Sequence, residues 1–344
     1  MRAVHIHGHG DIESVLFGEV SNPILQQGQA LVQVQAAALN HLDIWVRKGR
    51  PGLSLIFPHV LGSDAVGKVV EVGEDVDASW LGRTVVLNPG LWCGRCEWCL
   101  RGEHSECISY SIVGLGRWGT FAEQVAVPAA SLVVAPAHLS ALEAAALPLA
   151  YLTAWRMLTT RGQLRAGETL LIHGIGGGVA IAGLQLGKLM GARVMVTSSR
   201  EEKLSRAREL GADDTINYSE KSDVAGEVKR LTEGRGVDLV LDSTGGATWP
   251  INFASVRKGG RIVHCGVTTG KTAEVDIAAL YWNHISVMGS TMGTQEEFRS
   301  LISAVSAAKL KPVIDKVFPI AEGRAAQERM ENGDQFGKIV LEVG

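Results

Sequence analysis

The sequence lacks any long apolar run. Its 344 residues contain no stretch near 18 uninterrupted apolar residues, and the best candidate, residues 139–152, is broken by Glu143 and Pro148. A membrane-spanning helix needs about 20 such residues, so none is predicted. Residues 1–20 carry charges and three histidines but no continuous apolar segment, so we expect no signal peptide. Both absences predict a cytoplasmic protein that has no membrane partner.

An excess of one charge sign is also missing. The 33 Lys and Arg residues stand against 36 Asp and Glu residues, which gives a net charge of -3. Proteins that bind nucleic acid depend on a basic surface, so no nucleic-acid partner is expected. The hydrophobic fraction of 46% with 20% charged residues is ordinary for a globular protein. The length suggests about two domains.

Cysteine is scarce, yet four of the five cysteines fall within 15 residues. Their spacing is C-x2-C-x2-C-x7-C. Four thiolates can fill a tetrahedral shell around Zn²⁺ and leave no position for substrate, which predicts one structural zinc per chain in a lobe over residues 90–110. Two alternatives are disulfides, which are rare in the cytoplasm, and an iron–sulfur cluster, whose last cysteine is often followed by Pro rather than by Ile108. The predicted ligands are Cys93, Cys96, Cys99 and Cys107.

Two hydrophobic periodicities divide the chain. Residues 30–36 and 67–73 alternate with period two, and residues 84–88 form a short apolar run, so the first part is predicted to be strand-rich. Beyond about residue 165, strands and helices alternate, which predicts a doubly wound parallel sheet. The strands expected there are 169–173, 193–197, 215–217, 237–242, 261–265 and 285–288, with helices near 201–210 and 224–231 and a last strand at 337–343.

A glycine-rich turn follows the first of these strands. The run Gly174-Ile-Gly-Gly-Gly-Val-Ala180 leads into an amphipathic helix. Such a turn lets backbone N–H groups approach a pyrophosphate at a helix N-terminus, so Gly176, Gly177, Gly178 and Val179 are predicted to bind a dinucleotide. The alternative is a flexible turn without a ligand.

The end of the next strand bears on the choice of dinucleotide. Ser198, Ser199 and Arg200 stand where an NAD site would carry an acid, with Lys203 nearby. Hydroxyls and a guanidinium suit a 2′-phosphate, so NADP(H) is favoured over NAD(H). In the alternative, Arg200 and Lys203 are solvated residues at the helix start and Glu201 reaches the ribose.

Taken together, these motifs resemble the medium-chain dehydrogenase/reductase superfamily over nearly the whole length. Besides the cysteine lobe and the glycine loop, the resemblance rests on the segments 119–123, 152–155, 259–263 and 337–341. It implies an α/β protein with a GroES-like, strand-rich catalytic domain (residues 1–150 and 291–344) and a Rossmann domain (151–290). It also implies a small-molecule substrate and a homodimer or homotetramer.

The chain departs from the zinc alcohol dehydrogenases of that superfamily at the catalytic metal. Asn40 stands where they carry Cys, Ser63 and Asp64 stand where they carry His and Glu, and Leu149 stands at the third ligand position. Asn, Ser and Leu are poor or impossible zinc ligands. The Asn-x-x-Asp segment is similar to that of quinone and enone reductases, which need no catalytic zinc.

The resemblance therefore implies an NADP(H)-preferring reductase of small conjugated carbonyls or quinones. Its oxyanion donors would be Asn40 and Ser63, while His41 would supply a proton or bind the cofactor, and Trp45 with Tyr151 could wall the substrate. Further cofactor contacts implied by the resemblance are Thr153, Tyr218, Gly266, Val267, Ser290, Thr291 and Lys338.

Three alternatives stay open. An unusual metal site could form from His41, Asp43, His59 and Asp64. The protein could be an alcohol or aldehyde dehydrogenase that works with such an altered site. It could also be an NADPH-binding structural or sensing protein without useful turnover.

Overall fold

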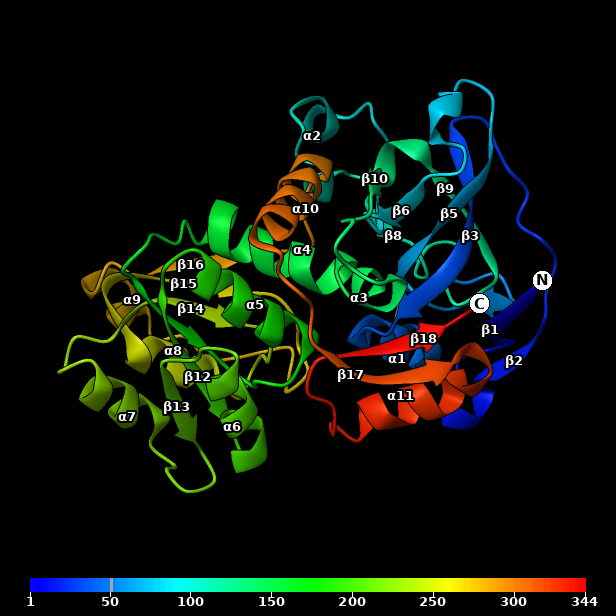
Figure 1. Ribbon diagram of the computed structural model, residues 1–344. Helices are drawn as coiled ribbons and strands as arrows, with labels where there is room; N and C mark the ends of the chain where they lie inside the picture. Colours follow the sequence, from blue (N-terminus) through cyan, green and yellow to red (C-terminus); the bar gives the residue numbers. More distant parts are fainter. Residues whose placement is uncertain (50–51) are drawn as a thin grey trace. The chain divides into compact units, whose positions relative to one another are not determined.

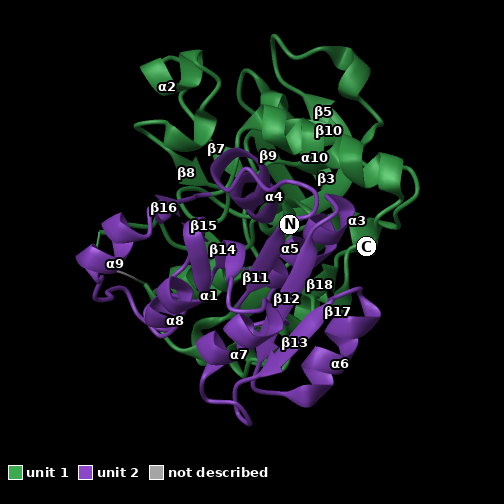
Figure 2. Ribbon diagram, turned by 90° about the vertical axis from the view of Figure 1, so that its left-hand side faces the viewer, with its two compact units in different colours: residues 1–152, 292–344 green, residues 153–291 purple. Residues whose placement is uncertain are grey.

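The computed structural model describes residues 1–49 and 52–344, which divide into two compact units (Figures 1 and 2). Unit 1 comprises Met1–Leu152 and Met292–Gly344, and unit 2 comprises Thr153–Thr291. The boundaries expected from the sequence, after residues 150 and 290, lie two residues and one residue away from these. Within the described ranges, no helix is both long and apolar enough to cross a membrane.

Unit 1 consists mainly of antiparallel strands, as the alternating pattern predicted. Its largest sheet has the order β10-β6-β5-β3-β18-β17, with β9 also paired to β3; smaller sheets are β2-β1-β4 and β7-β8. The strands are β1 (Arg2–Ile6), β2 (Leu16–Glu19), β3 (Gln29–Ala38), β4 (His59–Val60), β5 (Asp64–Val72), β6 (Thr84–Leu87), β7 (Gly90–Leu91), β8 (Ser111–Ile112), β9 (Gln124–Pro128), β10 (Leu132–Val134), β17 (Ile314–Pro319) and β18 (Lys338–Glu342).

The helices of this unit connect the strands. They are α1 (His41–Lys48), α2 (Glu97–Leu100), α3 (Ala141–Ala145), α10 (Gln295–Ala308) and α11 (Gly323–Glu331), while α4 (Pro148–Arg156) crosses the boundary between the units. The predicted capping box is present at α3, where Glu143 N–H donates to Ser140 Oγ at 3.2 Å and Ser140 N–H donates to Glu143 Oε2 at 2.8 Å. Both helix-terminal donors are thereby satisfied by side chains.

The end of the chain is built into the main sheet of unit 1. Strand β18, red in Figure 1, pairs antiparallel with β3 and parallel with β17. Apolar residues of β3, β5, β6 and β18 share one buried core, which includes Val32, Val69, Leu87 and Ile339. This pairing brings Lys338, the first residue of β18, beside the residues that follow β3.

Unit 2 contains the predicted parallel sheet, drawn in purple in Figure 2. Six strands follow the order β13-β12-β11-β14-β15-β16, and every neighbouring pair is parallel. This order confirms the doubly wound α/β fold. The elements are β11 (Thr169–Ile172), α5 (Gly178–Leu189), β12 (Arg193–Ser198), α6 (Glu201–Glu209), β13 (Asp214–Asn217), α7 (Val224–Leu231), β14 (Val237–Asp242), α8 (Trp249–Ser255), β15 (Val256–His264), α9 (Ile277–Trp282) and β16 (Ser286–Gly289).

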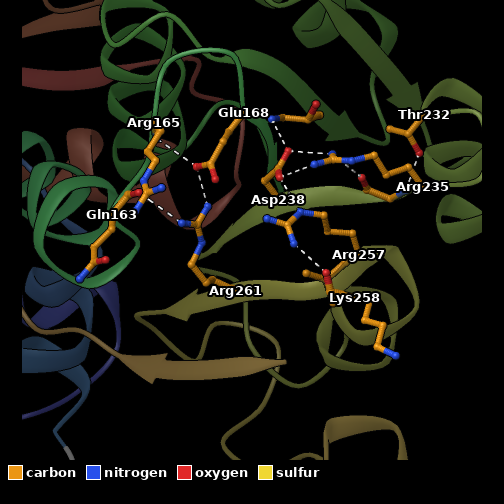
Figure 3. A network of polar contacts seen from close by, with 12 residues as sticks. Gln163, Arg165, Glu168, Thr232, Arg235, Asp238, Arg257, Lys258 and Arg261 are labelled. Atoms are coloured by element: carbon orange, nitrogen blue, oxygen red, sulfur yellow. Dashed lines mark hydrogen bonds and ion pairs between the residues drawn. The ribbon is translucent and has the colours of Figure 1, made fainter. Parts of the chain in front are cut away.

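A polar network fixes the amino-terminal edge of this sheet. Asp238, on β14, accepts hydrogen bonds from Nη1 and Nη2 of Arg235, from Arg257 Nε on β15 and from the Thr169 N–H on β11. Figure 3 shows Asp238 near Arg235 and Arg257, with the ion pair of Arg261 and Glu168 beside it. One carboxylate therefore ties three adjacent strands together at the edge where they begin.

Candidate functional site

A buried ion pair lies where strands β5 and β18 begin. The side chains of Asp64 and Lys338 are 0% and 4% exposed, and Lys338 Nζ lies 2.9 Å from Asp64 Oδ2. The amide of Asn40 bridges the pair, because its Nδ2 donates to Asp64 Oδ2 at 2.9 Å and its Oδ1 accepts from Lys338 Nζ at 2.6 Å. With the neighbouring Asp43, these residues are called the Lys338 cluster below.

Asp43 holds the start of helix α1. Asn40 is the N-cap residue of this helix, but its side chain is engaged by the ion pair. Asp43 Oδ2 instead accepts the Asn40 N–H at 2.7 Å. Burial raises the pKa of Asp43 to about 7; the Asn40 N–H bond and the Lys338 charge oppose the rise, and the Asp64 charge adds to it. The cluster therefore holds a second carboxyl that changes charge near neutral pH.

The three segments aligned with catalytic zinc ligands do come together. Asp64 Oδ2 meets Asn40 Nδ2, and Asp64 Oδ1 accepts the Leu149 N–H at 2.8 Å. In place of thiolate and imidazole, these segments present an amide, a carboxylate and an adjacent ammonium. They form a hydrogen-bonded network whose charges come from its own side chains.

Ser63 does not fit the expected role of an oxyanion donor. Its side chain is fully buried, and its hydroxyl donates to Val113 O at 2.7 Å. A serine hydroxyl has one proton to give, so none is left for a substrate oxygen. This prediction is corrected: in this structure Ser63 ties the start of β5 to the residue after β8.

The side chains of the alternative metal hypothesis do not gather as ligands. Among the described residues, the only group of three or more His, Cys, Asp or Glu whose ligand atoms lie within 4.8 Å of one another is the four-cysteine group. His59 Nε2 lies 3.0 Å from Gly114 O, and burial lowers the pKa of His59. Asp64 is held by Lys338 and Asp43 by the start of α1.

His41 and the two aromatic candidates lie in different environments. His41 is the first residue of α1, and its ring packs edge-to-face on Trp45 with centroids 5.5 Å apart. Although His41 is exposed to solvent, the packing around its ring lowers its pKa, and the charge of Glu331 opposes that effect. Tyr151 is buried in the core, which argues against its proposed place in a substrate wall. Thr153 is buried in α4.

The glycine loop combines left-handed glycine conformations with open space beside a helix N-terminus. It leaves β11 and enters α5, whose N-cap is Gly177. Gly174 and Gly176 have φ of 65° and 126°, which favour glycine. A Cβ added at Gly177 would meet nothing within 4 Å, so the space beside this residue is open. The unpaired N–H groups of the first turn of α5, a 12-residue helix, therefore have room for an anion.

The other predicted cofactor residues of unit 2 follow the carboxyl ends of its strands. Dinucleotides bind at this edge of doubly wound sheets, so their shared position fits such a cofactor. Tyr218 and Val267 are 45% and 43% exposed. Gly266, with φ of 108°, passes so close to Ser243 that a Cβ would lie 2.8 Å from its carbonyl oxygen. By strand, these residues are Ser198 as the last residue of β12, Ser199, Arg200 and Lys203 after it, Tyr218 after β13, Gly266 and Val267 after β15, and Ser290 and Thr291 after β16; Thr153 is the exception.

Sequence reasoning missed the polar group at the end of β14. Asp242 is fully buried, and it accepts bonds from the Thr244 N–H, Thr248 Oγ1 and Asn252 Nδ2. Burial raises its pKa, but the nearby His264 ring, whose Nδ1 lies 3.7 Å from Asp242 Oδ2, together with hydrogen bonds from Thr244 and Thr248 holds the pKa well below its usual range. An acid directly after the apolar run 239–241 was the available signal. This carboxylate fixes the loop beside the strand ends.

The four cysteines of the predicted lobe form a compact cluster between β7 and β8. All four are free thiols, so the disulfide alternative is wrong. Cys96 Sγ lies 3.5 Å from Cys99 Sγ, and the N–H groups of Cys93 and Ser109 donate to Cys107 Sγ at 3.3 and 3.4 Å. Four sulfurs at this separation, supported by backbone donors, fit a structural zinc.

The lobe stabilises thiolates unevenly. Backbone N–H groups of Cys99 and Ile108 lower the pKa of Cys96 to about 6, and those of Arg95 and Cys96 lower that of Cys93. Burial, followed by its sulfur neighbours, raises the pKa of Cys99 to about 12. A bound cation would deprotonate the remaining thiols, which is the chemistry expected of this donor set.

Two family models match the chain. Residues 26–137 match the alcohol dehydrogenase GroES-like domain, and residues 178–307 match the zinc-binding dehydrogenase family. The first match covers most of the strand-rich segment and the cysteine lobe. The second begins at Gly178, at the start of α5, and runs into α10.

Curated relatives and solved structures agree with these matches. The chain is 34% identical to a zinc-type alcohol dehydrogenase-like protein of Schizosaccharomyces pombe, over 93% of this chain and 92% of that protein. It is 32% identical to an NAD-dependent alcohol dehydrogenase of Saccharolobus solfataricus, over 99% of both. A crystal structure described as an NAD-dependent alcohol dehydrogenase superposes with a TM-score of 0.96 at 42% identity, covering 100% of both chains.

Proposed function

The chain belongs to the medium-chain dehydrogenase/reductase superfamily and is an oxidoreductase of that group, and on this premise we propose that it is an NADP(H)-preferring reductase of small conjugated carbonyls or quinones. The observation that carries the proposal is the Lys338 cluster. A buried ammonium, amide and carboxylate occupy the segments in which zinc alcohol dehydrogenases are expected to hold a metal. The Lys338 ammonium beside Asn40 and Asp64 repels a divalent metal ion and so disfavours metal binding there.

The proposed chemistry needs a donor for a developing oxyanion. When bound, the reduced nicotinamide supplies a hydride. One N–H of Asn40 Nδ2 donates to Asp64 Oδ2. The other points toward Ala38 O, and this hydrogen bond is weak because the N···O distance is 3.5 Å. This second N–H is the best available donor to a substrate carbonyl oxygen, where negative charge grows after hydride addition.

His41 has a supporting role in the proposal. Its lowered pKa keeps the imidazole neutral at neutral pH, so its N–H donates a hydrogen bond more readily than it releases a proton. Binding of a cofactor phosphate oxygen suits such a group. The glycine loop and the first turn of α5 would hold the pyrophosphate, and Ser198, Ser199 and Arg200 would hold the 2′-phosphate.

Zinc content and substrate preference test the proposal together. Protein purified without added metal should hold about one zinc per chain that stays bound during dialysis, because the cysteine shell is closed. It should oxidise NADPH with a simple cyclic enone or a benzoquinone. About two zinc atoms per chain, together with alcohol oxidation, would favour the second candidate, an alcohol dehydrogenase with an altered metal site, which the names of the relatives support.

Cofactor preference is tested at the end of β12. The relatives named NAD-dependent favour NAD(H), whereas the absence of an acid before Glu201 favours NADP(H). Glu201 Oε1 also accepts from Arg208 at 2.7 Å, so the first acid of α6 is already paired. Arg200→Ala should raise the KM for NADPH by about 10- to 100-fold and leave that for NADH unchanged, since only the phosphate loses a charged partner.

The matched control for that measurement is Lys258→Ala. Lys258 is an exposed cation of the same unit on β15, and its loss should change neither KM. A wild-type kcat/KM that is higher with NADH would overturn the proposed preference.

A homodimer or homotetramer is also part of the proposal. Strand β16 is the last strand in the sheet order, so one of its edges is open among the described residues. Beside it in sequence, α9 exposes Tyr281 at 64% and Trp282 at 72%, which is unusual for a monomer surface. Light scattering should give a multiple of the 36.6 kDa chain mass. Trp282→Glu should shift the protein toward monomer, and a monomeric wild type would refute this part.

A further inference from the structure

The ammonium of Lys338 makes all three of its possible hydrogen bonds inside unit 1. Its Nζ donates to Leu39 O at 2.6 Å, to Asn40 Oδ1 at 2.6 Å and to Asp64 Oδ2 at 2.9 Å. An ammonium has three N–H groups, so none remains for another acceptor. To reach a cofactor pyrophosphate, as the resemblance implies, Lys338 would have to abandon at least one of these bonds in a buried place. The cost of such an exchange is high because unpaired buried charges are strongly disfavoured.

The same bonds determine which way the Asn40 amide points. Its oxygen faces the ammonium, and its nitrogen faces the carboxylate of Asp64. A flipped amide would set NH₂ against the Lys338 cation and oxygen against the Asp64 anion, so the charges select one orientation. The ammonium on Oδ1 also polarises the amide, which strengthens its remaining N–H as a donor.

Asp64 is fixed in turn by other elements. Its Oδ1 accepts the Leu149 N–H of α4 at 2.8 Å, and its backbone oxygen accepts from Thr120 Oγ1 at 2.8 Å. The clamp on Asn40 is thus anchored on β18, β5 and α4, which are regular elements rather than mobile loops. Groups held in this way keep a donor in place without reorganisation during a reaction.

Building on the proposed reductase function, we propose that Lys338 is a positioning residue that, with Asp64, orients and polarises the Asn40 amide as the donor to the substrate carbonyl oxygen. In this assignment Lys338 does not bind the cofactor. The cation supplies, through Asn40, part of the charge stabilisation that a catalytic metal would give.

The first test separates catalysis from cofactor binding. Lys338→Met should lower kcat with an enone by about 10- to 100-fold, somewhat less than the effect of losing the donor itself. The Kd for NADPH, measured by cofactor fluorescence, should stay within about threefold, because no contact to a cofactor phosphate is lost. Lys338→Arg should restore part of kcat. The control is Lys68→Met, an exposed lysine on β5 outside the cluster, which should match the wild type.

The second test asks whether Lys338 acts through Asn40. In an Asn40→Ala background, Lys338→Met should cause little further loss of kcat, since the group it positions is gone. Additive losses would overturn the proposal. So would a rise of the NADPH Kd by tenfold or more with kcat kept, which would identify Lys338 as a cofactor ligand.

Two further measurements keep the proposal testable if Lys338→Met folds poorly or if no enone is reduced. The pair Lys338→Met with Asp64→Asn removes both charges and avoids a lone buried carboxylate, so it should fold better than either single variant. The side-chain amide NMR signal of ¹⁵N-labelled Asn40 should shift in Lys338→Met and stay unchanged in Lys68→Met. Absence of reductase turnover in the wild type would refute the proposed function alone, whereas an unmoved Asn40 signal would refute the clamp.

Discussion

At the residue scale, the buried carboxyl of Asp43 makes the stability of the protein depend on pH. Its pKa in the folded protein is about 7, against 3.8 for an ordinary Asp. Because the folded state holds this proton more tightly, the stabilisation is complete below pH 3.8 and is lost as the pH rises through about 7. Raising the pH from 5 to 8 should therefore lower the free energy of unfolding by roughly 2–3 kcal/mol through this group.

Asp43→Asn should remove that dependence. Urea unfolding at pH 5 and pH 8 should show a smaller loss of stability for the variant than for the wild type. The control is Asp77→Asn, because Asp77 is exposed and hydrogen bonds from Ser79 lower its pKa. Its contribution changes below the ordinary range of Asp, so between pH 5 and pH 8 it should behave like the wild type. Equal pH profiles for Asp43→Asn and the wild type would contradict the assignment.

Single residues also show how far the sequence can lead. Asn40, Asp64 and Leu149 could be aligned from motifs, and the structure brings them together. The commitment of the Ser63 hydroxyl to Val113 could not be foreseen, because a backbone partner 50 residues away leaves no pattern. Nor could the burial of Lys338, since lysine is ordinarily exposed and its position here follows from pairing of the last strand with β3.

At the element scale, the cysteine lobe should depend on its metal. Its segments are short, with α2 only four residues long and β7 and β8 two residues each, so they contribute little hydrophobic burial of their own. Cys99→Ser should lower the zinc content from about one to near zero per chain and destabilise the lobe, because the metal supplies much of its folding energy. Elemental analysis and limited proteolysis near residue 100 report both effects.

Cys265→Ser is the matched control for the lobe. Cys265 lies after β15, outside the cluster, and burial raises the pKa of its thiol to about 12, so it is an unreactive residue. The variant should keep about one zinc per chain, as the intact four-cysteine shell requires. Loss of zinc in Cys265→Ser, or its retention in Cys99→Ser, would show that the metal is held elsewhere.

The Asp238 network predicts how strongly the parallel sheet depends on one carboxylate. Asp238→Asn should destabilise unit 2 by roughly 2–3 kcal/mol, because hydrogen bonds between charged groups are lost while Arg235 and Arg257 regain some solvent. The measurement is chemical unfolding of the variant. Glu209→Gln, an exposed acid at the end of α6, should have no effect beyond about 0.5 kcal/mol. Equal stabilities of the two variants would contradict the role of Asp238.

Strands and helices were predictable where the hydrophobic periodicity of the sequence fits only one kind of secondary structure. Strands β11 and β14 and helix α7 begin where periodicity placed them. Strand β15 begins at Val256 rather than at residue 261, because it continues through Gly259 and Gly260 with a register shift against β14. A glycine pair indicates a turn in sequence, whereas here it accommodates an irregularity within a strand.

At the scale of the whole molecule, zinc and NADPH are expected to stabilise different units. The apolar residues of β3, β5 and β18 form a core within unit 1, and those of β11, β14 and β15 form a core within unit 2. The cysteine cluster belongs to unit 1 and the glycine loop to unit 2. Local opening reflects the contacts of the unit concerned, so each ligand should protect its own unit first.

Hydrogen exchange with mass spectrometry can test this division. Removing zinc with a chelator should speed exchange in residues 90–112 and in the first turn of α10, where the Gln295 N–H donates to His104 Nδ1 at 3.2 Å. Adding NADPH should instead slow exchange in the glycine loop and at the end of β12, because bound backbone N–H groups open less often. If chelation speeds exchange in β11 and β14 as much as in the lobe, the two units open together and the division fails.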